Sequence, residues 1–239
     1  MSELQPGLDA RYSAVQKKLL EAVKTAGKDE GDVFLLPVSK TFGLEAMEEA
    51  VACGMRAFGE NYVQEACEKI DYFREKHPEL ELTWHLIGPL QSNKTRPVAE
   101  RFDWVQTVDR LKIAERLSAQ RPASMPPLNV LIEVHISGEE SKSGAAPEDV
   151  RNLAEAITKL PNLKLRGLMA IPAPAESEEE QLKPLVAMRK LFDELKREGF
   201  DIDTLSMGMS TDMEAAVKAG STMVRVGSAI FGARDYSKK

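Results

Sequence analysis

Short apolar runs alternate along the chain with segments in which apolar side chains recur every three or four positions. Runs of the first kind are typical of buried strands, and repeats of the second kind are typical of amphipathic helices. An amphipathic helix is expected first, over residues 7–26, and Gly27 ends it. Strands, each followed by a helix or a helix-like segment, are expected at residues 33–38, 56–59, 82–87, 104–108, 128–136, 163–171, 204–207 and 222–226.

Regular alternation of strands and helices predicts a parallel sheet. The eight units, at a spacing of roughly 25–30 residues, match a closed (β/α)8 barrel, the TIM barrel, and leave no segment for a second domain. We therefore expect an α/β protein with one TIM-barrel domain over residues 1–239, in which residues 1–30 supply an extra N-terminal helix that packs on the barrel. The Pro-rich residues 121–127 are interpreted as a surface loop, and Thr211 with Glu214 as a helix capping box.

Composition narrows the class of protein. The chain is 43% hydrophobic, so it can bury a full core. Its formal net charge is −6 and it has no polybasic block, so it lacks the basic segment expected for binding to nucleic acid or an anionic membrane. No apolar run approaches the ~20 residues that span a bilayer, and the polar N-terminus has no signal core. Cys53 and Cys67 lie in helical patterns without a CxxC motif, which argues against zinc and disulfides. We expect a cytoplasmic monomer without metal, because a domain that buries its own core requires no dimer.

Candidate chemistry begins with Lys40, which ends the apolar run at residues 33–38. A lysine ammonium at the end of a buried strand is costly to desolvate unless it has a partner or a reaction to perform, although many such lysines simply mark where a strand reaches solvent. In (β/α)8 barrels the functional residues lie at the carboxyl ends of strands, and phosphate is often bound after strands seven and eight.

Glycine and hydroxyl residues follow both of those strands. Gly227 and Ser228 come after the eighth strand, where free backbone N–H groups and a hydroxyl can bind phosphate oxygens. Residues 208–211 offer a similar set after the seventh strand, but Asp212 and Glu214 make that helix start less attractive to an anion. Ordinary helix capping would account for either pattern, and we favour the site at Gly227 and Ser228.

Arg225 lies within the eighth strand between two valines, so its side chain points to the face opposite theirs. If that face lines the barrel interior, the guanidinium needs a partner there, either a ligand or a core carboxylate such as Glu133. A lysine amine combined with a phosphate site suits pyridoxal 5′-phosphate (PLP). The same combination suits a class I Schiff-base aldolase acting on a phosphorylated substrate, and the residues alone leave both readings open.

Several motifs together carry a family resemblance over almost the whole chain. The sequence resembles the YggS/PROSC family, the pyridoxal phosphate homeostasis proteins. The matching segments are Val-Ser-Lys-Thr at 38–41, Phe-Gly-Glu-Asn-Tyr at 58–62, Trp-His-Leu-Ile-Gly at 84–88, Leu-Gln-Ser-Asn-Lys at 90–94, Lys-Ser-Gly at 142–144, Ser-Met-Gly-Met-Ser at 206–210, Val-Arg-Val-Gly-Ser at 224–228 and Ile-Phe-Gly at 230–232.

The resemblance implies a barrel similar to the N-terminal domain of alanine racemase, with PLP bound as a Schiff base on Lys40. It implies that Asn61 lies beside the ring and that Arg225 faces the pyridine nitrogen. The phosphate would be held by Ser210, Gly227 and Ser228.

Some positions depart from the family pattern or have no assigned role. Family members usually carry Thr at Ser228, many carry Asn at His135, and a proline is usual where Phe42 and Gly43 stand. These changes bear on local loop shape and leave the cofactor expectation intact. His85 could line the site, but a hydrogen-bonded core histidine is an equal interpretation. Lys142 could be a gate or a secondary aldehyde site, and a solvated loop lysine is slightly favoured.

The residues also bear on whether the protein is an enzyme. An arginine at the pyridine nitrogen disfavours protonation of that nitrogen and so weakens the ring as an electron sink. Racemisation needs a base on each face of the substrate carbon. Lys40 could serve one face, whereas Tyr62 is better interpreted as a packing residue at a helix start.

We therefore expect a protein of intracellular vitamin B6 homeostasis that holds PLP and delivers it, with PLP-dependent apoenzymes as recipients, and that does not catalyse efficient turnover. The alternatives are a monodomain PLP-dependent amino-acid racemase and the Schiff-base aldolase.

Overall fold

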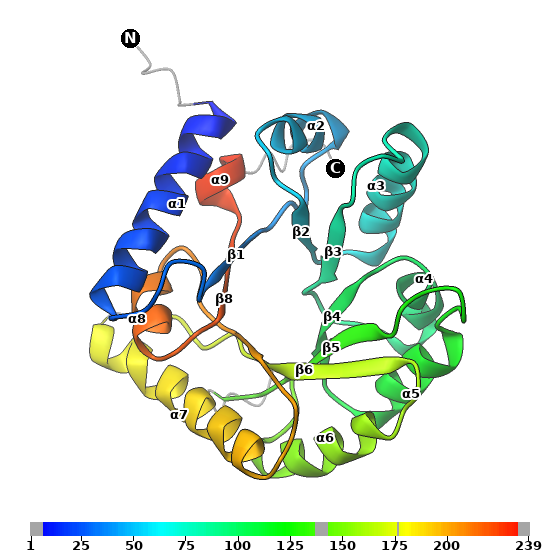
Figure 1. The fold of residues 1–239 in the computed structure, drawn as a ribbon, viewed down its shortest axis with the longest axis vertical. Coiled ribbons are helices and arrows are strands. Elements are labelled where there is room, and N and C mark those ends of the chain that lie inside the picture. Colours follow the sequence, from blue (N-terminus) through cyan, green and yellow to red (C-terminus); the bar gives the residue numbers. More distant parts are fainter. Residues whose placement is uncertain (1–6, 137–142, 176, 234–239) are drawn as a thin grey trace.

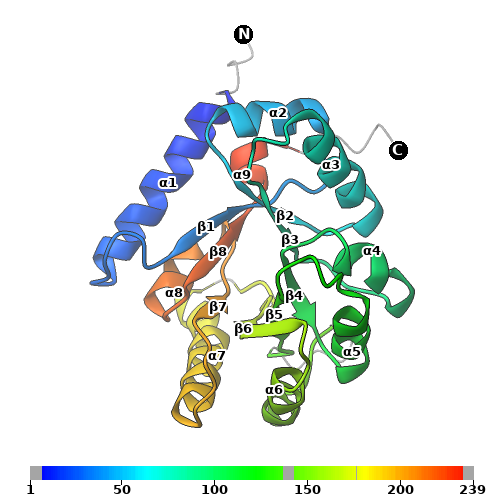
Figure 2. The ribbon, with the colours of Figure 1, turned by 45° about the vertical axis from the view of Figure 1, so that its right-hand side comes forward.

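The computed structural model describes residues 7–136, 143–175 and 177–233. Within these ranges, eight parallel strands form one sheet in the order β1-β8-β7-β6-β5-β4-β3-β2. An isolated parallel bridge between Val38 and Gly59 joins the two edges of that sheet. Figure 1 shows the resulting ring of strands with helices outside it, and Figure 2 shows the same arrangement after a turn of the view. The expected α/β TIM barrel is confirmed.

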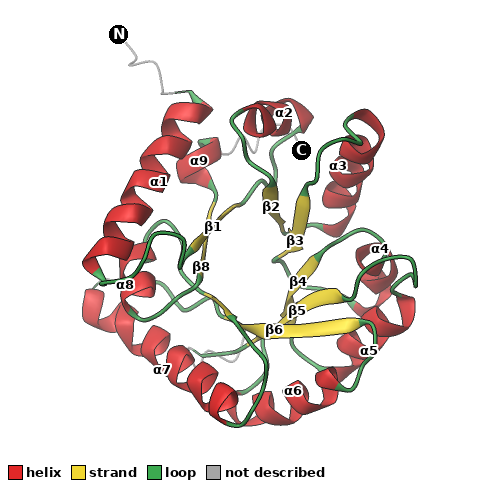
Figure 3. Cartoon of the chain, viewed as in Figure 1, coloured by secondary structure: helices red, strands yellow, loops and turns green. Residues whose placement is uncertain are grey.

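All eight expected strands form, and most are shorter at one or both ends than the apolar runs. They are β1 (Phe34–Pro37), β2 (Ala57–Glu60), β3 (Thr83–Leu86), β4 (Trp104–Val108), β5 (Leu128–Glu133), β6 (Leu163–Met169), β7 (Thr204–Ser206) and β8 (Met223–Val226). The helices, coloured red in Figure 3, are α1 (Leu8–Thr25), α2 (Leu44–Ala52), α3 (Val63–Lys76), α4 (Thr95–Ala99), α5 (Leu111–Gln120), α6 (Val150–Thr158), α7 (Glu178–Arg197), α8 (Met213–Lys218) and α9 (Ser228–Phe231), with short 3-10 turns at Ser92–Lys94 and Pro147–Asp149.

The expected N-terminal helix is α1, which packs against α8 and α9 (Figure 1). Its apolar stripe of Val15, Leu19 and Val23 is buried. Arg11 on this helix donates from Nε to the backbone oxygen of Ile230 at 2.7 Å, so the start of the described chain is tied to its end. None of the helices in the described ranges combines the length and the apolar character needed to cross a bilayer.

Strand alternation divides the apolar residues into two cores. The larger core lies between the strands and the helices, and Val224 and Val226 on β8 belong to it. The smaller core lies inside the barrel and consists of Leu36, Val38, Ala57, Ile87 and Met223. Because Arg225 alternates with the two valines, it points into the interior, as the sequence pattern predicts.

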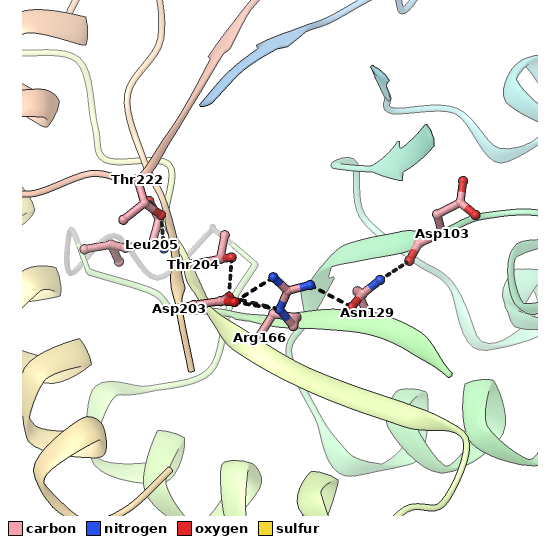
Figure 4. Close-up of polar contacts among 7 residues, drawn as sticks. All are labelled: Asp103, Asn129, Arg166, Asp203, Thr204, Leu205 and Thr222. Atoms are coloured by element: carbon pink, nitrogen blue, oxygen red, sulfur yellow. Dashed lines mark hydrogen bonds and ion pairs between the residues drawn. The ribbon is translucent and has the colours of Figure 1, made fainter. Parts of the chain in front are cut away.

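A polar layer closes the amino end of the strands. Figure 4 shows the Arg166 guanidinium between Asn129 and Asp203, with N–O distances of 3.0 Å to Asn129 Oδ1 and 2.7 Å to Asp203 Oδ2. The same guanidinium lies over the Trp104 ring, 4.6 Å from its centroid. This layer lies at the opposite end of the barrel from the loops that follow the strands, so it serves to close and stabilise the fold.

One local expectation is wrong and another is confirmed. The capping box of Thr211 and Glu214 does not form, because α8 begins later, at Met213, with Asp212 as its N-cap residue, and the Asp212 side chain makes no capping hydrogen bond. Residues 121–127 form the expected surface loop, in which only the first residue, Arg121, is buried. Its Nη1 donates to the backbone oxygens of Ala99 and Phe102 at 2.8 and 2.7 Å.

Candidate functional site

Lys40 lies where the two edges of the sheet meet. Just before it, the Val38 N–H donates to the Val226 oxygen of β8 at 2.8 Å, and the Ser39 N–H donates to the Gly59 oxygen of β2 at 3.0 Å. Lys40 is half-buried. The ends of β2 and β8 therefore flank the lysine at the carboxyl mouth of the barrel, and they carry Asn61 on one side and Gly227 on the other.

Asn61 follows β2 directly, and its side-chain Oδ1 is buried with no hydrogen-bond partner among the described residues. A buried acceptor without a partner costs about 1–3 kcal/mol, so it is expected to serve a ligand or to receive an ordered water. Gly88 allows this position: a Cβ at residue 88 would lie 2.3 Å from the Asn61 backbone oxygen. Only glycine lets the loop after β3 approach the loop after β2 so closely.

The expected phosphate residues lie on the opposite side of the lysine. Gly227 follows β8, and Ser228 opens α9 with an exposed side chain, at a helix start whose first N–H groups have no partner within the helix. Ser210 follows β7 and is half-buried. The Arg225 N–H donates to the Gly208 oxygen at 2.9 Å, which holds the loop that carries Ser210 beside β8.

Arg225 is buried inside the barrel, with 3% of its surface exposed. Its Nη1 donates to Ser206 Oγ at 2.7 Å, and its Nη2 donates to the Ala170 oxygen at 2.9 Å. Glu133, the carboxylate considered as its partner, acts on Arg225 through its charge but makes no direct ion pair with it among the described residues. Burial lowers the pKa of Arg225 to about 10, with the charges of Asp212 and Glu133 opposing this, so the guanidinium remains cationic at neutral pH.

Sequence reasoning missed the polar chain that supports Arg225. Ser206 Oγ donates to Gln106 Oε1 at 2.6 Å, and Gln106 Nε2 lies 3.1 Å from His85 Nδ1. Nδ1 then accepts the amide proton, and burial lowers the pKa of His85 to about 3, so the ring is neutral and hydrogen-bonded. The one available signal was Gln106 itself, a polar residue inside the apolar run of β4.

Glu133 is a second residue that the sequence did not place at the mouth. It is the last residue of β5 and is 8% exposed. Burial and the charge of Asp109 raise the pKa of Glu133 to about 7, while Arg225 opposes this. A carboxyl group with such a pKa can exchange a proton at physiological pH.

Three other residues were considered from the sequence. Tyr62 is 54% exposed at the start of α3. His135 follows β5 and has a buried Nε2 with no partner in the described part of the chain. Lys142 lies outside the described residues.

Comparison with known proteins agrees with this geometry. The family model for the N-terminal domain of alanine racemase matches residues 12–235. The alanine racemase of Clostridium difficile superposes with a TM-score of 0.71 at 18% identity, over 90% of this chain and 56% of the racemase, which shows the shared fold. The fold and the matched model thus define a barrel of the alanine racemase N-terminal class.

Closer relatives define the family within that class. Proteins named pyridoxal phosphate homeostasis protein from Vibrio cholerae and Escherichia coli are 56% and 55% identical over 94% of this chain, and the matches cover 95% and 96% of those proteins. PipY of Synechococcus elongatus, solved with PLP bound, has a TM-score of 0.82 at 32% identity and covers 95% of this chain and 100% of PipY. The chain belongs to the pyridoxal phosphate homeostasis protein family, and the resemblance inferred from its motifs is confirmed.

Proposed function

We propose that this protein binds PLP covalently through Lys40 and acts in the homeostasis of that cofactor, holding and delivering it without efficient turnover. One observation carries the proposal: the hydrogen bonds of the β1 end to β2 and β8 gather Lys40, Asn61, Arg225 and Gly227 at one mouth. The names of the relatives and the PLP bound to PipY support it.

The side chains present at the mouth fit such a group. The buried Asn61 Oδ1 offers an acceptor that no described residue uses. Arg225 donates two of its five N–H groups to described protein atoms, which leaves donors to face a ring nitrogen. Ser210, Gly227 and Ser228 supply hydroxyl and backbone N–H donors suited to a phosphate.

Each residue then has a distinct task. The bound cofactor supplies an aldehyde carbon that amines attack and a ring that can accept electrons. Lys40 would hold the aldehyde carbon through its amine, while Asn61 orients the ring. Ser210, Gly227 and Ser228 would bind the phosphate on the other side of the lysine, so that covalent and ionic contacts fix the two ends of the cofactor independently.

Arg225 is the reason to expect little turnover. Its guanidinium is cationic at neutral pH, and a fixed cation disfavours a second positive charge on a nearby ring nitrogen. Two hydrogen bonds to Ser206 and Ala170 hold it in place. The weakened electron sink favours a carrier that passes PLP to recipient apoenzymes. The proposal includes a cytoplasmic monomer that acts as one domain.

A single observation favours a second candidate, weak racemase-like chemistry: Glu133 has a pKa of about 7 at the same mouth. It could exchange the α-proton of a bound amino acid on a face that Lys40 does not serve. We test this by incubating the PLP-loaded protein with amino acids in deuterated water. Exchange of the α-proton at catalytic rates would support the enzyme and contradict the carrier, and exchange no faster than with PLP alone would support the carrier.

The main test is reduction of the protein with borohydride in the presence of PLP, followed by peptide mapping. We expect a pyridoxyl phosphate adduct on the peptide that contains Lys40, and none in Lys40→Ala. An adduct mainly on another lysine, including Lys142, would refute the assignment. A trapped sugar fragment on Lys40, after incubation with phosphorylated sugars instead of PLP, would support the aldolase.

A further inference from the structure

The residues around Lys40 form a strained turn. The Phe42 N–H donates to the Ser39 oxygen at 3.1 Å, so Lys40 and Thr41 are the two central residues of a β-turn. Thr41 has a φ of 69° and is the only non-glycine residue of the described ranges with a positive φ. A β-branched residue is strongly disfavoured in this region, so the surrounding structure must impose the conformation.

Three hydrogen bonds to one cluster, in which Glu60 and Lys69 are buried and Glu65 is partly exposed, hold that turn. Lys69 Nζ donates to the Ser39 backbone oxygen at 2.9 Å, and Ser39 Oγ donates to Glu60 Oε1 at 2.6 Å. The Thr41 N–H donates to Glu65 Oε1 at 2.7 Å. The residues on both sides of Lys40 are therefore anchored to Glu60, Glu65 and Lys69, which we call the turn cluster.

Lys69 links the two carboxylates of the turn cluster. Its Nζ forms ion pairs with Glu60 at 2.8 Å and with Glu65 at 2.6 Å. The side chains of Lys69 and Glu60 are 4% and 0% exposed. Burial raises the pKa of Glu60, and the charge of Lys69 opposes that shift. Without the lysine, two carboxyl groups would face each other and lose their shared counter-charge.

The turn cluster is poorly explained by stability alone. Buried ion pairs are often no more stabilising than apolar residues of similar volume. Glu60 Oε2 is also buried without a hydrogen-bond partner in the described chain. By contrast, the hydrogen bonds of the turn cluster fix both residues that flank Lys40, Ser39 and Thr41. The cluster lies on the helix side of β2, because Glu60 alternates with the interior-facing Gly59 and pairs with Lys69 on α3.

We propose that Glu60, Glu65 and Lys69 are positioning residues that hold the Ser39–Phe42 turn so that the Lys40 amine is presented to the cofactor. The inference rests on the proposed role of Lys40 and goes beyond it by assigning a function to residues outside the mouth. It predicts that the turn cluster affects covalent attachment and leaves recognition of the phosphate and ring unchanged.

Two ligands separate these effects. PLP carries the aldehyde, whereas pyridoxine 5′-phosphate carries an alcohol in its place and cannot react with Lys40. We expect Lys69→Met to weaken PLP binding by about tenfold or more, because it removes the hydrogen bond from the charged Lys69 amine to the Ser39 oxygen, and hydrogen bonds to charged groups are stronger than neutral ones. The same variant should change binding of the alcohol by less than about twofold. The control is Lys159→Met, which removes an exposed ion pair to Glu155 at 2.9 Å with the same i,i+4 spacing. It should change neither.

A pair of variants at Glu65 tests the contact to Thr41 directly. Glu65→Gln keeps an oxygen acceptor for the Thr41 N–H and should retain PLP binding within about threefold, whereas Glu65→Ala should lose about tenfold. Equal loss for PLP and the alcohol in Lys69→Met would show a general structural role and overturn the inference. No loss for PLP would overturn it as well.

Hydrogen exchange in the ligand-free protein keeps this test separate from the proposed function. We expect the Thr41 amide to exchange at least tenfold faster in Lys69→Met than in the wild type, since Glu65 loses the ion pair that holds it. If the wild type traps no PLP on Lys40, the proposed function fails, and the positioning of the amine for PLP fails with it. If the wild type traps PLP but Thr41 is equally protected in both proteins, the positioning inference alone is overturned.

Discussion

His85 offers a quantitative test of the polar interior. Its ring is 2% exposed, stacks on Trp104 with centroids 5.1 Å apart, and has its Nδ1 3.1 Å from Gln106 Nε2. Burial lowers its pKa from 6.5 to about 3. The unfolded chain therefore binds a proton more readily than the folded one, so this group's contribution to stability is complete above pH 6.5 and is lost as the pH falls toward 3.

The magnitude follows from the two pKa values. One pKa unit corresponds to about 1.4 kcal/mol, so protonating His85 in the folded protein costs about 5 kcal/mol, and the linkage relation gives a loss of about 3 kcal/mol in stability between pH 7.5 and pH 4.5. We expect His85→Asn to lack this loss. Its side-chain oxygen can still accept from Gln106, while the lost ring stacking lowers stability equally at both pH values.

Urea unfolding of both proteins at pH 7.5 and 4.5 measures the difference, since contributions from other titrating groups cancel. The chain has three histidines, so a proton NMR titration can also follow each ring. We expect the His85 signal to stay unshifted down to pH 4.5 and the His77 signal, whose pKa is raised by its hydrogen bond to Glu48, to shift above pH 6.5. A His85 signal that titrates near pH 6.5, or an identical loss of stability in His85→Asn, would refute the reasoning.

Two further predictions concern the mouth. The pKa of Glu133 is raised from 4.5 to about 7, so its stabilising contribution is complete below pH 4.5 and is lost as the pH rises through 7. Between pH 5 and pH 8 the free energy of unfolding of the wild type should therefore fall by about 3 kcal/mol more than that of Glu133→Gln, as measured by urea unfolding. Equal pH dependence in both proteins would contradict this. In Gly88→Ala the new Cβ would displace the Asn61 backbone, 2.3 Å away, so PLP affinity in a spectroscopic titration should fall about tenfold or more, and unchanged affinity would show that Asn61 does not contact the cofactor.

The fold was largely predictable because apolar runs and helical repeats report burial directly. All eight strands and the inward direction of Arg225 follow from alternation. What alternation cannot show is which inward residues meet across the barrel. The hydrogen bonds from Arg225 through Ser206 to Gln106 join β8, β7 and β4. Ser206 and Gln106 are 100 residues apart in the sequence.

The turn cluster was hidden for a different reason. Glu65 and Lys69 are four residues apart on a helix, a spacing typical of exposed ion pairs, yet Lys69 is buried because α3 lies against the end of β2. Thr41 contradicts its own backbone preference, so no propensity argument could place it in a left-handed conformation. Similarly, Arg121 lies in a Pro-rich loop, but its side chain donates a hydrogen bond to a buried backbone oxygen, that of Ala99.

A crystal structure of the protein grown with PLP tests the central claim most directly. The account predicts continuous density from Lys40 Nζ to the cofactor, with the phosphate at Gly227 and Ser228 and the ring nitrogen facing Arg225. Density for PLP on a different lysine, or a cofactor in this mouth that is not joined to Lys40, would contradict it.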